Sequence, residues 1–252
     1  MEKIKVDNLS FSYPSSDKLA LDSVSLSIPE SEFVVLCGKS GCGKSTLLRH
    51  LKKSMNPYGN KFGSVCFDGE EIEEMNDRDA ASKIGYVQQN PDNQLVTDKV
   101  WHELAFGLES LGYSNSVIKR RVAEMASYFG IQTWFRKSVS ELSGGQKQLL
   151  NLASVMAMQP EVLILDEPAS QLDPIAARDF LSTVHRLNRE LGVTIIISEH
   201  RLEEIFPLAD RAIVMDEGRI IANARPSEVA IQLAGNGDDE SVHPMYYGMP
   251  PV

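Results

Sequence analysis

The spacing of apolar and polar positions divides this chain into strand-forming and helix-forming parts. Residues 2 to 30 alternate apolar and polar positions with turn residues between them, which is typical of antiparallel strands. Residues 162 to 165 are continuously apolar and residues 193 to 198 nearly so, as in strands that a parallel sheet buries on both faces. From about 98 to 158, apolar positions recur at helical spacing. The pattern therefore predicts an α/β protein with helices inserted between its strands.

Local signals predict several shorter elements. Asp77 is placed to cap a short helix over residues 78 to 83, and Pro174 to begin a long helix that ends near Leu191. Glu217 and Gly218 form the turn of a predicted hairpin. The other expected strands cover residues 33 to 37, 63 to 67 and 84 to 87, and the hairpin strands cover 211 to 215 and 219 to 222.

A glycine-rich loop follows the strand over residues 33 to 37 and precedes a stretch with helical spacing. Its glycines remove side chains where backbone N–H groups can converge on phosphate oxygens, and the following helix points its positive end at the same place. This strand, loop and helix context indicates a phosphate-binding loop. The loop consists of Gly38, Lys39, Ser40, Gly41, Cys42, Gly43, Lys44, Ser45 and Thr46.

Three side chains of this loop carry specific expectations. Lys44 supplies a mobile positive charge for the β- and γ-phosphates of a nucleoside triphosphate, and Ser45 offers a hydroxyl to Mg²⁺. Cys42 lies within the loop, so we expect a bulky thiol reagent to block nucleotide binding. The loop predicts nucleotide binding without saying what the energy of the nucleotide is used for.

Polar residues also follow two of the predicted strands. The apolar strand over 162 to 165 ends in Asp166 and Glu167, whose carboxylates are expected at the carboxyl edge of the sheet, where open α/β sheets place ligands. The strand over 84 to 87 leads into an amide-rich loop over residues 88 to 94. These groups are candidates for chemistry beside the phosphate loop.

Composition excludes several other functions. A formal net charge of −10 argues against a broad nucleic-acid-binding face, which requires clustered Lys and Arg. The three cysteines have neither the number nor the spacing of a disulfide framework or a zinc site, which fits a reducing cytosol. No apolar run approaches the roughly 18 residues needed to cross a bilayer, so work on a membrane is expected to be done through partners.

Three motifs in order resemble the nucleotide-binding subunits of ATP-binding cassette (ABC) transporters. The most specific is the family's signature pentapeptide, which lies between the phosphate loop and the strand that ends in Asp166. Two glycines in it would cost stability inside a helix, so propensity alone does not explain them. The pentapeptide is Leu142, Ser143, Gly144, Gly145 and Gln146.

The resemblance covers about residues 2 to 234 and implies a fold and a division of the chain. It implies an α/β fold of the P-loop NTPase (RecA-like) type, with a mixed-sheet core, an N-terminal antiparallel β subdomain and an inserted α-helical subdomain. The ATP-binding domain is expected over 1–234, with its core at 1–90 and 160–234 and the helical subdomain at about 95–158. Residues 235–252 are rich in glycine and acids and are expected to form a flexible tail or linker.

The family's catalytic roles carry over to residues at matching positions. Glu167 resembles the general base that polarises the attacking water, and His200 the histidine that contacts the γ-phosphate. Gln89 resembles the glutamine that senses Mg²⁺ and the water, and Gln88 is the alternative, disfavoured because Gln89 directly precedes Asn90 and Pro91. The implied metal set is Ser45, Gln89 and Asp166, and the implied cofactors are ATP and Mg²⁺.

Two further roles concern the ends of the nucleotide. Tyr13 lies in a turn, where an aromatic side chain is by itself more often a packing residue, but the resemblance implies that it stacks on adenine. Ser143 and Gly145 are implied to act on the ATP held by a second ABC ATPase chain or cassette, since the family pairs head to tail. Gln171 departs from the usual alanine in the loop that crosses this interface.

The amide-rich loop and the residues after it resemble a subgroup, the energy-coupling factor (ECF) ATPases that drive uptake of vitamins and of cobalt or nickel ions. This implies a transmembrane scaffold protein docked in the groove lined by residues 89 to 101, a separate substrate-binding membrane protein, and a place at the cytoplasmic face of the cell membrane. The alternatives are the ATPase of an ordinary ABC importer and a soluble ABC protein without a transport role. The acidic linker also suggests the first cassette of a longer two-cassette protein.

Overall fold

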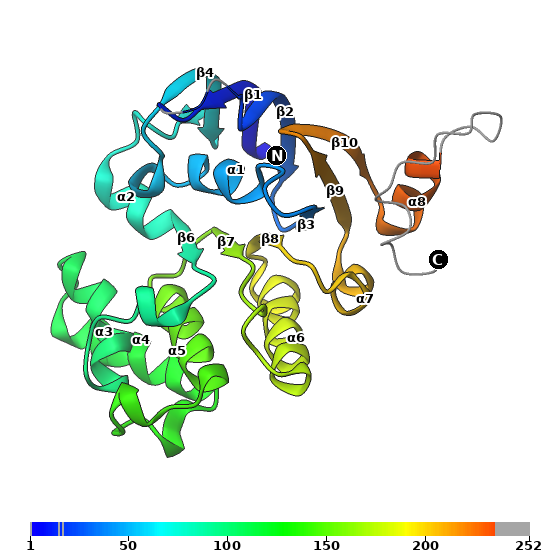
Figure 1. The fold of residues 1–252 in the computed structure, drawn as a ribbon. Coiled ribbons are helices and arrows are strands. Elements are labelled where there is room, and N and C mark those ends of the chain that lie inside the picture. Colours follow the sequence, from blue (N-terminus) through cyan, green and yellow to red (C-terminus); the bar gives the residue numbers. More distant parts are fainter. Residues whose placement is uncertain (1, 15, 17, 235–252) are drawn as a thin grey trace.

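The computed structural model describes residues 2–14, 16 and 18–234, and its two β-sheets lie above a group of helices in the view of Figure 1. The predicted tail over 235–252 lies outside the described residues. Among the described residues, no helix is long and apolar enough to cross a membrane. The expected division at 1–90, 95–158 and 160–234 stays a proposal, and the elements below are given as they lie along the chain.

The first sheet is antiparallel and has the strand order β2-β1-β4-β5. Apolar residues of β1 alternate toward its buried face, where Ile4 and Val6 pair with Ile28 and Leu26. The antiparallel strands predicted over residues 2 to 30 are confirmed. The four strands are β1 (Glu2–Ser12), β2 (Leu21–Pro29), β4 (Asn60–Phe67) and β5 (Glu70–Glu71).

The second sheet is mixed and has the strand order β10-β9-β3-β8-β7-β6. All its neighbours pair in parallel except β9 and β10, which form the predicted antiparallel hairpin. The predicted α/β architecture with a mixed-sheet core is thereby confirmed. The six strands are β3 (Phe33–Gly38), β6 (Ile84–Val87), β7 (Val162–Asp166), β8 (Thr194–Ser198), β9 (Arg211–Asp216) and β10 (Arg219–Ala224).

The helices lie on both sides of the mixed sheet, with α1 and α2 on the side of the antiparallel sheet and α3 to α6 on the other (Figure 1). Their bounds are α1 (Lys44–His50), α2 (Asp77–Lys83), α3 (Val100–Ser110), α4 (Asn115–Tyr128), α5 (Gly144–Ala157), α6 (Pro174–Leu191), α7 (Leu202–Ile205) and α8 (Pro226–Ala234). Short 3-10 turns cover Lys53–Met55, Pro91–Asn93, Ile131–Thr133, Val139–Glu141 and Phe206–Leu208.

Strand β3 packs against a hydrophobic core on each of its two faces. Side chains alternate across a strand, so Phe33 and Val35 pack in one core with the helices α3 to α6, whereas Val34 and Leu36 pack in the other with the antiparallel sheet and α1. All four side chains are buried. The strand that leads into the phosphate loop is therefore clamped between two cores.

The predicted cap of α2 was wrong by one residue. The side chain of Asn76 accepts a hydrogen bond from the backbone N–H of Asp79 at 2.8 Å, and Asp77 is the first residue inside the helix. Asn76 has the extended backbone that an N-cap requires, and its side-chain oxygen then reaches the third helical N–H.

The other end of α2 is closed by the buried side chain of Lys52. Its Nζ donates to the carbonyl oxygens of Ala80 at 2.8 Å and Ala81 at 3.1 Å, and also to that of Ile84 at the start of β6. Burial lowers the pKa of Lys52 to about 8. These carbonyls are groups that a helix leaves without a partner at its C-terminus, so the lysine replaces a backbone cap.

Replacing Lys52 with methionine is therefore expected to lower the free energy of unfolding by about 3 kcal/mol, because buried carbonyls would lose their donor. Urea unfolding monitored by circular dichroism would measure the change. Lys119→Met, at an exposed position of α4, is the matched control and is expected to leave stability within about 0.5 kcal/mol. Equal stability of the two variants would contradict this account of Lys52.

Candidate functional site

The glycine-rich loop joins the end of β3 to the start of α1, as predicted (Figure 1). Gly38 and Gly43 have positive φ angles of 149° and 107°. A side chain at Gly38 would place its Cβ 2.3 Å from the carbonyl oxygen of Met215, and one at Gly43 would come 2.5 Å from that of Ala20. These glycines therefore allow the loop to pass close to the neighbouring backbone, a reason the sequence did not reveal.

Lys44 lies beneath this loop and is 4% exposed. Its Nζ donates to the carbonyl oxygens of Gly38 at 2.9 Å and Lys39 at 3.1 Å. The ammonium group thus holds the two ends of the loop together and brings a positive charge to its centre. Such a charge suits phosphate oxygens.

Cys42, in the same loop, is buried, so the expected block of nucleotide binding by a bulky thiol reagent stays a prediction that depends on access to this thiol. The side chain is 5% exposed. Burial raises the pKa of its thiol, although the charge of Lys44 acts in the opposite direction. The low exposure of the side chain and the raised pKa of its thiol each reduce the supply of accessible thiolate, which is the reactive form.

Asp166, at the end of β7, receives hydroxyl groups from three elements. Ser45 of α1 and Ser198 of β8 each donate to its Oδ1 at 2.9 Å, and Tyr86 of β6 donates to its Oδ2 at 3.1 Å. Asp166 is 8% exposed. The structure thus brings together Ser45 and Asp166, two of the three residues predicted to hold a metal ion.

The donor set of this site fits Mg²⁺. A hydroxyl and a carboxylate lie side by side at the foot of a phosphate loop, and Mg²⁺ takes oxygen ligands that include substrate phosphates and water. Among the described residues, no group of three or more His, Cys, Asp and Glu side chains is placed to hold a metal. A protein-only cage for a transition metal is thus not found there.

Glu167 is the centre of the predicted catalytic residues. Its Oε1 lies 2.8 Å from Nε2 of His200, and its Oε2 accepts a hydrogen bond from Nε2 of Gln89 at 3.2 Å. The backbone of Glu167 has a positive φ of 47°, which is strained for a residue other than glycine. The structure therefore collects the three side chains at one point, next to Asp166, although they come from three separate segments.

Gln88 and Gln89 have different surroundings. Gln89 reaches Glu167, whereas the backbone of Gln88 is held inside the loop: its N–H donates to Oε1 of Gln94 at 2.9 Å and its carbonyl accepts from Gln148 at 3.2 Å. Gln94 also accepts from Asn151 at 3.0 Å. The amide-rich loop is thus bonded to α5, the helix that begins with the signature glycines.

Tyr13 lies close to the helix that follows the phosphate loop. Its hydroxyl is 3.3 Å from Oγ1 of Thr46, and its ring packs edge-on against Phe11 with centroids 4.9 Å apart. This position contributes both a packing contact and a partly exposed aromatic face beside the loop.

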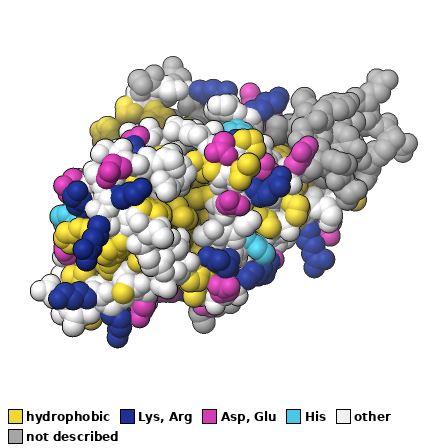
Figure 2. All heavy atoms as spheres, turned by 90° about the horizontal axis from the view of Figure 1, so that it is seen from below, with side chains coloured by type: hydrophobic (Ala, Val, Ile, Leu, Met, Phe, Trp, Pro, Cys, Tyr) yellow, Lys and Arg dark blue, Asp and Glu magenta, His cyan; other side chains and the backbone are white. Residues whose placement is uncertain are grey.

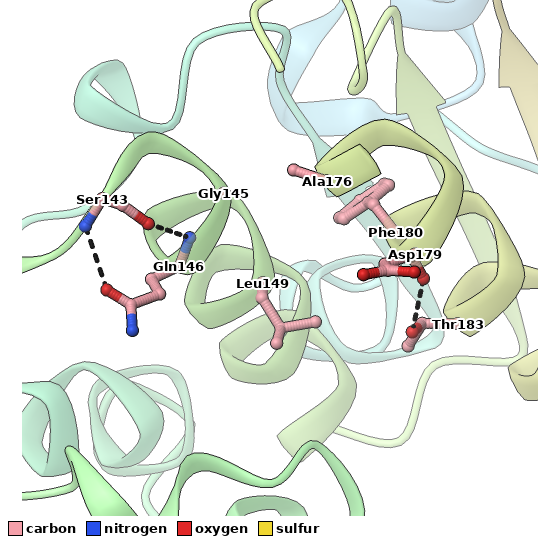
Figure 3. Close-up of a pocket in the computed structure, with 8 residues that line it drawn as sticks. All are labelled: Ser143, Gly145, Gln146, Leu149, Ala176, Asp179, Phe180 and Thr183. Carbon is pink, nitrogen blue, oxygen red and sulfur yellow. Dashed lines mark hydrogen bonds between the residues drawn. The ribbon is translucent and has the colours of Figure 1, made fainter. Parts of the chain in front are cut away.

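The signature residues begin α5, on the far side of the mixed sheet from α1. Ser143 caps the helix as predicted, accepting from the N–H of Gln146 at 3.3 Å, while Gln146 accepts from the N–H of Ser143 at 3.0 Å. Figure 3 shows these residues lining a pocket between α5 and α6. No contact joins them to the phosphate loop of the same chain among the described hydrogen bonds, so the structure does not unite the two predicted halves of the ATP site within one chain.

The two signature glycines differ in their surroundings. A Cβ at Gly145 would lie 3.3 Å from that of Ala176 on α6, so a glycine there allows α5 and α6 to approach. A Cβ at Gly144 would meet nothing within 4 Å. Packing inside this chain therefore gives no reason for the glycine at position 144.

Tyr86 and Ser198 are site residues that sequence reasoning missed. Ser198 ends β8 and Tyr86 is the next-to-last residue of β6, the two strands that flank β7, so the available signal was a hydroxyl residue at or next to each neighbouring strand end. Burial first, and then the charge of Asp166, raise the pKa of the Tyr86 phenol, which keeps it a hydrogen-bond donor. Its hydroxyl fixes the orientation of the Asp166 carboxylate.

Tyr86→Phe is expected to raise the Mg²⁺ concentration needed for half-maximal nucleotide hydrolysis several-fold, because Asp166 would lose one of its three donors, a charge-assisted hydrogen bond worth about 1.5–3 kcal/mol. Nucleotide binding in EDTA, measured by fluorescence, should be unchanged. Tyr58→Phe, at a tyrosine 87% exposed, is the control. An unchanged Mg²⁺ requirement would show that Tyr86 does not orient Asp166.

Fold and site together define a nucleotide-binding protein of the phosphate-loop type. Residues 21 to 170 match the ABC transporter family. The chain is also 50% identical over 229 residues to a protein of Bacillus thuringiensis subsp. konkukian, provisionally named an ABC transporter ATP-binding protein, with 91% of this chain and 42% of the relative covered. A relative of the same provisional name from Methanosarcina mazei is 39% identical, with 96% of this chain and 41% of the relative covered.

Two solved structures extend the comparison. CbiO1 of Clostridium perfringens, described as part of the ABC transporter complex CbiONQ, has a TM-score of 0.82 and 32% identity over 91% of each chain. The ABC transporter cassette MJ1267 in its ADP conformation has a TM-score of 0.79 and 26% identity over 98% of each chain. The chain belongs to the ABC transporter family and has the fold of its ATPase domain. It spans about two fifths of the length of the curated relatives it matches first.

Proposed function

We propose that this chain binds and hydrolyses ATP to power a membrane importer through nucleotide-driven closure of a cassette dimer. The observation that carries the proposal is the placement of the Glu167 carboxylate between His200 and Gln89, beside the pair formed by Asp166 and Ser45. This arrangement provides a base, a γ-phosphate contact and a cation site within one cluster.

Each residue has a distinct part in the proposed reaction. Lys44 and the backbone N–H groups of the loop bind the phosphates, and Tyr13 stacks on the adenine. Ser45 and Asp166 would hold Mg²⁺, with Gln89 reaching toward it, and the cation would neutralise charge on the phosphates. Glu167 orients the attacking water and accepts its proton. His200, which bonds the carboxylate oxygen of Glu167 that Gln89 does not, contacts the γ-phosphate.

A second cassette completes the proposed site. The open space at Gly144 leaves room for phosphate oxygens of another subunit beside the N-terminus of α5. Ile175, at the start of α6, is 76% exposed next to the loop that holds Gln171, which suits a surface covered by a partner. The cassette MJ0796 has been solved as a dimer. The second cassette comes from another copy, a related ATPase, or another part of a longer polypeptide.

The transporter is proposed to be of the ECF type, importing a vitamin or a transition-metal ion. The likeness to CbiO1 and the amide-rich loop support this subtype. Beside that loop, Val96 and Trp101 are 63% and 45% exposed. Hydrophobic side chains gather beside Lys and Arg on the end of the molecule that carries α3 and α4, on the left of Figure 2. A membrane scaffold protein would cover them at the cytoplasmic face.

The proposal predicts that a hydrophobic scaffold protein co-purifies with this chain from native membranes, and that the complex takes up cobalt, nickel or a vitamin when ATP is supplied. Uptake of an amino acid or sugar would instead favour an ordinary ABC importer. Association with ribosomes in place of a membrane protein would contradict the transport role.

Trp101→Ala is expected to weaken capture of that scaffold at least about tenfold while leaving the ATPase rate of the isolated chain unchanged, because exposed aromatic residues often anchor interfaces. Phe62→Ala is the matched control, since Phe62 is 71% exposed on β4, at the opposite side of the molecule. Equal capture of both variants would contradict docking at Trp101.

A further inference from the structure

Four successive residues, beginning with the last residue of β8, contact the end of β7 and the segment that follows it. Ser198 pairs with Asp166 at the end of the sheet, and its hydroxyl accepts from the N–H of Glu167 at 3.0 Å. Three residues later, Arg201 donates to the carbonyl oxygen of Leu172 at 2.9 Å. Side chains thus continue the pairing of the two strands beyond the point where the sheet ends.

Glu199 is the buried member of this series. It is 1% exposed, and each of its carboxylate oxygens accepts one backbone N–H at 3.0 Å: Oε1 from Ala169 and Oε2 from His200. Burial raises the pKa of Glu199, and the backbone N–H groups of His200, Ala169 and Arg201 act against that rise. Among the described residues, no lysine or arginine forms an ion pair with it. Burying a carboxylate costs free energy, so the position of Glu199 needs an explanation beyond packing.

The two backbone groups held by Glu199 flank the catalytic contact. Nε2 of His200 lies 2.8 Å from Oε1 of Glu167, and Ala169 is the second residue after Glu167. The positive φ of Glu167 costs of order 1 kcal/mol or more and persists only where the surroundings fix it. Ser198 accepts the N–H of Glu167 itself and Glu199 accepts the N–H of Ala169, and these hydrogen bonds supply that constraint at and after the strained residue.

We propose that Glu199 is a positioning residue, which holds the turn after Glu167 and the backbone of His200 at a fixed separation so that the two side chains stay in contact. This role rests on the proposed function of Glu167 and His200 in ATP hydrolysis. Glu199 touches neither the nucleotide loop nor the reacting atoms in this account, and acts through the two residues it aligns.

Glutamine is a sharp probe at this position. It matches the size of glutamate, but one of its two terminal atoms is an NH₂ group, which cannot accept a hydrogen bond. In Glu199→Gln, one backbone N–H would therefore face a donor, and the hydrogen bond to either Ala169 or His200 would be lost. We expect kcat for ATP hydrolysis to fall about tenfold, with the dissociation constant for ATP changed less than about twofold.

A double-mutant cycle tests whether Glu199 acts through His200. The variants are Glu199→Gln, His200→Ala and both together in the full chain, with Glu203→Gln as an exposed control of equal charge change. If the role is correct, the glutamine costs about tenfold in the wild-type background and less than about twofold in the His200→Ala background. Equal losses in both backgrounds, or no loss in the first, overturn it.

A second measurement does not depend on how the variants fold. In the wild-type protein, the backbone N–H groups of Ala169 and His200 should exchange slowly with deuterium, because Glu199 holds both; rapid exchange overturns the proposal. A wild-type chain that lacks ATPase activity even when it is paired with its second cassette overturns the proposed function and this role with it. An active wild type with an equally active Glu199→Gln variant overturns this role alone.

Discussion

Replacing Glu167 with glutamine is expected to lower kcat for ATP hydrolysis by about 100-fold or more while ATP still binds. The amide keeps the size of the side chain but cannot accept a proton from water at neutral pH, and general base catalysis typically contributes factors of this order. Lys44, Ser45 and Asp166 form the phosphate and cation side of the site, and the described hydrogen bonds of the Glu167 carboxylate go instead to Gln89 and His200. A phosphate-release assay would give kcat, and a fluorescent ATP analogue would give the affinity.

Glu30→Gln is the control for this variant, because Glu30 is exposed on the loop before β3 and makes the same change of charge. Its turnover should equal that of the wild type. Because the glutamine variant keeps the ATP contacts and loses the hydrolysis step, it should also accumulate the ATP-bound dimer. Hydrolysis at the wild-type rate in Glu167→Gln would contradict the assignment of the base.

Replacing Lys44 with alanine is expected to weaken binding of ATP itself, by about tenfold or more. The ammonium is buried under the loop and is the charge available for the β- and γ-phosphates, and a charge-assisted hydrogen bond contributes about 1.5–3 kcal/mol. The carbonyl oxygens of Gly38 and Lys39 would also lose their donor, so the loop would be less ordered. Titration calorimetry with ATP and with ADP would measure both affinities.

Lys119→Ala, at an exposed site on α4, should bind ATP like the wild type. The two main variants are thus expected to differ in kind: Lys44→Ala affects binding, and Glu167→Gln affects turnover. An unaltered ATP affinity in Lys44→Ala would refute the reading of the loop as a phosphate site, because its charge would then make no contact that matters.

The strand and loop arrangement could be predicted because it depends on local patterns. Runs of apolar residues marked β3, β7 and β8, and the glycines with Lys44 marked the loop between β3 and α1. The same patterns placed Asp166 and Glu167 at a strand end. Sequence spacing cannot measure how near Gln89 or His200 comes to Glu167, because the three residues are far apart along the chain. The order of strands in the sheet brings them together.

The burial of Cys42 and the contacts of Tyr86 and Glu199 were decided by the tertiary structure. The sequence places Cys42 in a phosphate loop but does not tell how accessible its thiol is. The packing of α1 against the antiparallel sheet buries it. Tyr86 lies near the end of β6 and Glu199 just after β8, and the apolar and polar pattern at these positions gives no sign of their roles. Their partners, Asp166 and Ala169, follow only from the tertiary structure, because the sheet places β6, β7 and β8 side by side.

The sequence by itself determined the class of this protein, because hydrophobic periodicity fixes which segments become strands and a few motif residues fix the chemistry they carry. It determined the phosphate loop, the carboxylate pair and the signature helix. The tertiary structure decided which of these meet within one chain. Glu167, His200 and Gln89 meet there, whereas the phosphate loop and the signature residues stand on opposite sides of a sheet, since the strands between them are buried on both faces and hold the two groups apart.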